Sequence, residues 1–220
     1  MLSKLPRWIW IGIWVLAFVA GAVNVVGFLC FSHQSVTHLT GTTSMLGASL
    51  GTADMRAAAR YLSVLASFVF GAFVSGYTVR DGALQLGRHY GIIMIAEAGL
   101  LYLSPHLLAR ANIWGIYVAS CACGLQNGMV TNYSGAVVRT THVSGMFTDL
   151  GLFLGNAVRG QPYDRRRLQM CCLVISGFLL GGVAGSWLFG PLGVFALYVP
   201  ATVVLLAGFV YFSYARSIPS

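Results

Sequence analysis

Six long apolar stretches dominate this sequence, and they span residues 8–31, 57–79, 89–108, 113–133, 168–189 and 194–214. Each is long enough to cross the hydrocarbon core of a bilayer as a helix, which takes roughly 20 residues. Backbone polar groups in hydrocarbon have to be paired within the structure, so only helices and closed barrels cross membranes. We therefore predict an all-α integral membrane protein with six transmembrane helices, in a single membrane domain over residues 1–220.

The composition agrees with this prediction, because 57% of the residues are apolar and only 8% are charged. Soluble domains carry roughly 25% charged residues, with which they coat their surface. The net charge of +8 does not indicate nucleic-acid binding, since no basic stripe interleaved with aromatics is present. The dense basic cluster at residues 165–167 lies between two apolar stretches, where the positive-inside rule expects such residues.

Two further segments, residues 35–53 and 141–158, look helical but are short and rich in Gly, Ser and Thr. Each is either a re-entrant half-helix or a short full crossing. The charge rule does not decide between six and eight crossings, because both put ten of the 13 lysines and arginines inside, with both termini in the cytoplasm. We favour six crossings, because residues 37–44 are too polar to face lipid.

An internal repeat links these two polar segments. Residues 36–47 align without gaps to residues 140–151, and both copies read Thr-His-x-[Thr/Ser]-Gly, then a second hydroxyl residue and Leu-Gly. Hydrophobicity does not dictate these positions, so the match predicts a two-fold repeat of approximately residues 8–108 and 112–214. Three crossings in each half would make the copies inverted, as in many secondary transporters, and four would make them parallel.

The polar motifs also carry a resemblance to the YoaK-like family of uncharacterised transmembrane proteins. It rests on Gly41 and residues 46–47 in the first copy and on residues 124–127 and 139–145 in the second. The resemblance covers essentially the whole chain and implies a multi-pass cell-membrane protein of about six helices without an established activity. The chain departs from the family pattern in two places: Thr42 stands where the family usually has Asn, and Asn24 where it usually has Asp.

Three amide side chains lie at mid-depth of predicted helices, namely Asn24, Gln126 and Asn127. Polar groups at this depth face the protein interior or water, because an unpaired polar group in hydrocarbon costs several kcal/mol. These amides either clamp helices together or line a central cavity that binds a polar solute. Residues 21–24 align with residues 124–127 across the repeat, so Asn24 corresponds to Asn127. This pairing favours the cavity, and a two-fold axis would bring Asn24 close to Asn127.

The repeated Thr-His-x-[Thr/Ser]-Gly segments are candidate helix N-termini. Their solute-binding candidates are Thr37, His38, Thr40, Gly41, Thr141, His142, Ser144 and Gly145. A threonine cap would leave backbone N–H groups and the positive dipole end pointed at a ligand, which suits an anion or a carbonyl group. The glycines would let the backbone approach that ligand closely. The alternative is a cap and turn between helices, without a ligand.

The titratable candidates are few. His38 and His142 occupy matching positions and either carry a proton or, as we favour, are satisfied interfacial histidines. Two histidines without a third ligand make a poor metal site, so we expect no metal and no cofactor. Glu97 lies mid-helix and Asp149 lies in the second motif, where a carboxylate acts as a proton carrier or a counter-charge.

The sequence contains no enzyme signature, so we do not expect an enzyme. The leading hypothesis is a transporter or channel of the cell membrane, with a site for a small polar or anionic solute at the repeat interface. The alternative is a membrane scaffold or sensor whose polar motifs lock helices together. The partners that we expect are the lipid bilayer and a second copy of the chain, packed through the small-residue face at residues 181–185.

Overall fold

A computed structural model describes residues 7–30, 39–79, 89–134 and 140–216, which fold into helices joined by turns. The helices are α1 (Arg7–Cys30), α2 (Leu39–Gly51), α3 (Met55–Thr78), α4 (His89–Ala109), α5 (Trp114–Ser134), α6 (Val143–Val158), α7 (Arg165–Leu192), the short 3-10 helix η2 (Gly193–Leu197) and α8 (Tyr198–Arg216). An α-helix lies in each of the eight predicted segments, so the all-α fold class is confirmed.

Four stretches of the described chain are long and apolar enough to cross a bilayer, and they are Trp8–Cys30, Met55–Thr78, His89–Ala109 and Arg165–Ser213. The last stretch is 49 residues long and contains α7, η2 and most of α8. Helix α5 is not among the four, because Gln126, Asn127 and Asn132 lower its mean hydropathy. Several spans of this length make the chain a multi-pass membrane protein.

Helices α1 and α5 form the interior of the bundle. Val19 and Val26 on α1 and Ala122 on α5 are fully buried. The outer helices α3 and α8 instead expose large apolar side chains, such as Phe73 at 64% and Val210 at 71%. Soluble proteins rarely expose contiguous apolar surface of this kind, whereas lipid tails accept it directly.

Glycines bring two pairs of helices into backbone contact. Helix α1 packs on α7, where a Cβ on Gly21 would overlap with the carbonyl of Phe178. Helix α3 packs on α5, where a Cβ on Gly124 would overlap with the carbonyl of Phe68. Small residues allow this close approach between membrane helices. Residues 181–185 belong to the first contact, and their glycines are covered by α1 rather than open to a second copy, so a homodimer stays a prediction.

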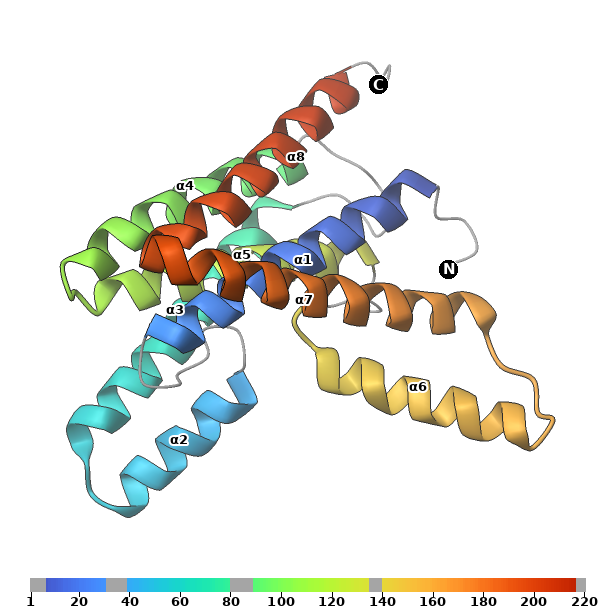
Figure 1. The fold of residues 1–220 in the computed structure, drawn as a ribbon, viewed down its shortest axis with the longest axis horizontal. Helices are drawn as coiled ribbons and strands as arrows, with labels where there is room; N and C mark the ends of the chain where they lie inside the picture. The colour runs from blue at the N-terminus through green and yellow to red at the C-terminus, as the bar shows by residue number, and fades with distance from the viewer. Residues whose placement is uncertain (1–6, 31–38, 80–88, 135–139, 217–220) are drawn as a thin grey trace.

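The short helices α2 and α6 diverge from the centre of the molecule. Each begins near the middle in Figure 1, and they end on opposite sides of it. Helix α2 packs on α3 and α6 packs on α7. At a rise of about 1.5 Å per residue, their 13 and 16 residues extend roughly 20 and 24 Å, less than the hydrocarbon core of about 30 Å.

Candidate functional site

A cleft of about 640 Å³ lies where the starts of α2 and α6 meet the four helices α1, α3, α5 and α7. Its polar lining residues are Asn24, Thr40, Asn127, Thr131, Asn132, Thr141, His142 and Ser144. The apolar lining includes three phenylalanines, Phe68, Phe147 and Phe178, together with Leu39, Ala72 and Val143. Among the described residues of the lining, none is Asp, Glu, Lys or Arg, so apart from the imidazole of His142 the polar groups of the cleft are uncharged amides and hydroxyls.

The cleft brings together candidates from both predicted copies of the motif. Asn24 and Thr40 come from the first copy, and Asn127, Thr141 and Ser144 come from the second. Thr37 and His38 lie outside the described residues. Gly41 and Gly145 are half-buried but do not line the cleft.

Asn127 is held in place by bonds on both sides of its amide group. Its Nδ2 donates to the carbonyl of Cys123 at 3.0 Å, and its Oδ1 accepts from Thr141 Oγ1 at 2.9 Å. The side chain is buried at the wall of the cleft, with 7% of its surface exposed. The bond to Thr141 ties helix α5 to the segment that leads into α6.

Gln126 has a different position from its neighbour. It is buried outside the cleft lining, and its Nε2 donates to the carbonyl of Leu16 at 2.9 Å and to Thr140 Oγ1 at 2.8 Å. These bonds join α5 to α1 and to the residues before α6. In the described structure Gln126 thus joins three segments and does not line the cleft.

The start of α6 differs from the prediction of a threonine cap. His142 is the N-cap residue and makes no side-chain capping hydrogen bond, while Thr141 bonds to Asn127 instead. The imidazole ring of His142 lies against Gly145, where a Cβ would overlap with it. Glycine at residue 145 thus makes room for a histidine ring rather than for a ligand.

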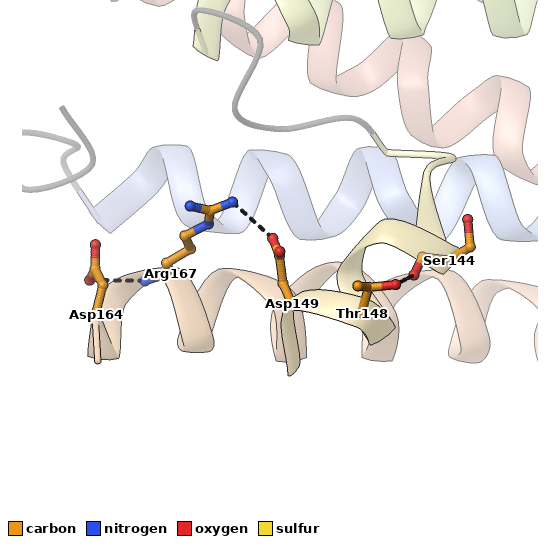
Figure 2. Close-up of polar contacts among 5 residues, drawn as sticks. All are labelled: Ser144, Thr148, Asp149, Asp164 and Arg167. Carbon is orange, nitrogen blue, oxygen red and sulfur yellow. Dashed lines mark hydrogen bonds and ion pairs between the residues drawn. The ribbon is translucent and has the colours of Figure 1, made fainter. Parts of the chain in front are cut away.

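Both short helices repeat one internal hydrogen bond near their starts. Ser44 Oγ donates to the carbonyl of Thr40 at 3.1 Å in α2, and Thr148 Oγ1 donates to the carbonyl of Ser144 at 3.0 Å in α6. Figure 2 shows the second of these bonds. The carbonyls of Thr40 and Ser144 are thus occupied by their own helices.

The two candidate carboxylates lie away from the cleft. Asp149 forms an ion pair with Arg167 at 3.1 Å, which fastens α6 to the first turn of α7 (Figure 2). Asp164 caps the same turn by accepting from the backbone N–H groups of Arg166 and Arg167. Glu97 lies in the core stripe of α4 and is 1% exposed.

Sequence reasoning did not name several residues of the cleft. Thr131 and Asn132 follow Asn127 by about one helical turn, so they lie on the same face of α5. Polar residues at this spacing in an apolar helix could have identified them as residues of the cleft. Phe68 and Phe178 also line the cleft, and each begins a matching stretch of the two halves, Phe-Val-Phe-Gly at residues 68–71 and Phe-Leu-Leu-Gly at residues 178–181.

A family model described as "Protein of unknown function (DUF1275)" matches residues 12–210, a range that contains every residue of the cleft lining. No curated protein and no solved structure matches the chain.

Proposed function

We propose that this chain, which belongs to the DUF1275 family of proteins of unknown function, lets a small uncharged polar solute cross the cell membrane through its cleft. The observation that carries the proposal is the polar lining, which gathers side chains of both motifs in a membrane protein. Polar groups at membrane depth line water-filled paths or pair with one another.

The chemistry of the lining selects the solute. Amide and hydroxyl groups of Asn24, Asn127 and Ser144 both donate and accept hydrogen bonds, which suits solutes with amide or hydroxyl groups. A cation in this cleft would have no carboxylate as a counter-charge among the described lining residues, and burying it would be costly. The N-termini of α2 and α6 supply partial positive charge, which favours a carbonyl oxygen.

The arrangement of the helices supports six crossings with α2 and α6 as re-entrant half-helices. Both are too short to cross, and both begin near the centre of Figure 1. Helix α1 begins and α8 ends on the side where α7 begins, as an even number of crossings requires. The arginines at residues 165–167 lie on that side, so the positive-inside rule puts both termini in the cytoplasm.

The packing pattern supports an inverted repeat. Helix α1 packs on α7 as α5 packs on α3, and α2 packs on α3 as α6 packs on α7. Gly21 meets Phe178 in one pair, and Gly124 meets Phe68 in the other. A two-fold relation between residues 8–108 and 112–214 would produce such matched contacts, with the cleft at the interface between the halves.

The second candidate function is a membrane scaffold or sensor without transport. The observation that favours it is the clamp by Gln126, because a polar repeat residue there only joins helices. The two candidates differ in one respect: transport requires open space in the cleft, and a scaffold does not.

Stopped-flow reswelling of proteoliposomes in urea and in glycerol tests this difference. We expect the wild-type protein to raise solute entry above that of empty liposomes. Ser144→Phe should abolish the increase by filling the cleft, whereas Thr148→Phe, one turn further along the exposed part of α6 and outside the lining, should preserve it. Wild-type rates equal to those of empty liposomes would contradict transport of urea and glycerol. Entry of acetate above that of empty liposomes, without such an increase for urea or glycerol, would show that the solute is an anion.

A further inference from the structure

Glu97 is a buried carboxylic acid without an adequate set of partners. It is the single glutamate of the chain, it is 1% exposed, and its Oε2 has no hydrogen-bond partner in the described part of the chain. It lies in the core stripe of α4 together with Met94, Ala98 and Leu101. A leucine would fill this position without leaving a polar atom unpaired.

The surroundings of Glu97 disfavour a negative charge. An ionised carboxylate in an apolar interior needs a cation or several donors, and without them it costs several kcal/mol. No described basic side chain forms an ion pair with Glu97, since the described ion pair of the chain joins Asp149 and Arg167. The described surroundings of Glu97 thus offer no compensation for a negative charge.

One turn of α5 connects Glu97 with the cleft. Glu97 on α4 and Cys123 on α5 are both buried, and these two helices pack against each other. The carbonyl of Cys123 accepts from Asn127 Nδ2, and Asn127 lines the cleft. The packing of α4 on α5 thus joins the helix that carries Glu97 to the helix that carries the cleft residue Asn127.

Each α-helix that packs against α4 carries titratable residues. Helix α8 contributes Tyr211 beside Tyr90 and Tyr198 beside His106, each about two turns from Glu97 along α4. The short helix η2 contains no titratable residue. Helix α5 adds Tyr117, Cys121, Cys123 and, beside Tyr90, Tyr133, and α3, which also packs on α4, carries Arg56, Arg60, Tyr61 and Tyr77.

We propose that Glu97 is a proton-binding site and that it couples proton movement to the passage of solute through the cleft. This inference rests on the proposed transport function. In a conformation that hydrates Glu97 from one side, hydronium gives its proton to the carboxylate, which forms the O–H bond of the carboxylic acid and leaves one water molecule behind. In a conformation that hydrates Glu97, this O–H bond breaks and the proton passes to water on the other side.

Infrared spectroscopy of the whole protein tests the proton site without any solute. The chain has five acidic side chains, so the carbonyl band of a neutral carboxylic acid is readily assigned. We expect this band at neutral pH in the wild type, its loss in Glu97→Gln, and its retention in Asp164→Asn, which alters an exposed cap of α7. Absence of the band from the folded wild type would overturn the proposal.

Coupling is tested in proteoliposomes that contain a pH-sensitive dye and receive urea or glycerol from outside. We expect solute entry to change the internal pH in the wild type, and Glu97→Gln to lose this change while solute still enters. Solute entry that never changes the internal pH would overturn coupling and leave the proposed transport intact. No solute entry at all would overturn the transport function itself, while the infrared result would still decide the proton site.

A second variant separates a proton site from a structural acid. Glu97→Leu removes an unpaired polar group from an apolar position, so we expect a folded protein at least as heat-stable as the wild type. It should lack the proton signal as completely as Glu97→Gln does. A marked loss of thermal stability in both variants, with an unchanged proton signal in the protein that remains folded, would show that Glu97 is a packing residue.

Discussion

The backbone of Gly21 in α1 lies directly against the carbonyl group of Phe178 in α7. The same relation joins Gly124 in α5 to Phe68 in α3. Both phenylalanines also line the cleft, so each glycine contact fixes a helix that bounds it. The width of the cleft therefore depends on two positions at which any side chain would force the helices apart.

Gly21→Ala should destabilise the protein by about 1–3 kcal/mol, the usual effect of overpacking a close contact. Gly12→Ala is the matched control in the same helix, because a Cβ there meets no described atom within 4 Å. Thermal unfolding in detergent measures both variants. Equal unfolding temperatures for the two would contradict the close packing of α1 on α7.

Thr141→Val should reduce solute entry, because it removes the hydroxyl that holds Asn127 Oδ1 at the wall of the cleft. The loss of one such bond also costs about 0.5–1.5 kcal/mol of stability. Thr148→Val is the control, since its hydroxyl bonds only within α6 among the described contacts. Unchanged urea and glycerol entry in a folded Thr141→Val protein would argue against a role for the Asn127 amide.

Gln126→Met should lower the unfolding free energy by about 1–3 kcal/mol, because the carbonyl of Leu16 and the hydroxyl of Thr140 then lose a buried donor. Gln169→Met, on the exposed surface of α7, should stay within about 0.5 kcal/mol of the wild type. The prediction fails where both variants unfold at the same temperature.

The ion pair of Asp149 and Arg167 should contribute no more than about 1 kcal/mol, because 26% and 52% of these side chains are exposed. A double-mutant cycle with Asp149→Asn and Arg167→Gln measures it, and the coupling should fall as salt is added. A coupling several times larger than about 1 kcal/mol that persists at high salt would show that the pair is shielded from solvent in the membrane.

Single cysteines at Thr52 and Asn112, in a background without native cysteines, should react with a membrane-impermeant reagent from outside the cell. A cysteine at Gln161 should react only after the membrane is opened. These positions lie in the turns that follow α2, α4 and α6. With eight crossings, Thr52 and Asn112 would instead lie on the cytoplasmic side together with Gln161, and the labelling pattern would change accordingly.

The helices of this protein were predictable because apolar length and polar interruptions are local properties. Residues 8–31 and 89–108 had to become long helices in any membrane, and α1 and α4 coincide with them closely. The small-residue run at residues 181–185 likewise predicted close packing between helices. The sequence did not say which helix would pack there, and α1 of the same chain occupies the face expected for a second copy.

By itself, the sequence determined a membrane-embedded helical chain whose two polar motifs match. Only the tertiary structure decided that Asn127 faces the cleft while its neighbour Gln126 clamps Leu16 and Thr140. The physical reason is that successive residues of a helix point about 100° apart, so neighbours with the same chemistry meet different surroundings once the helices have packed.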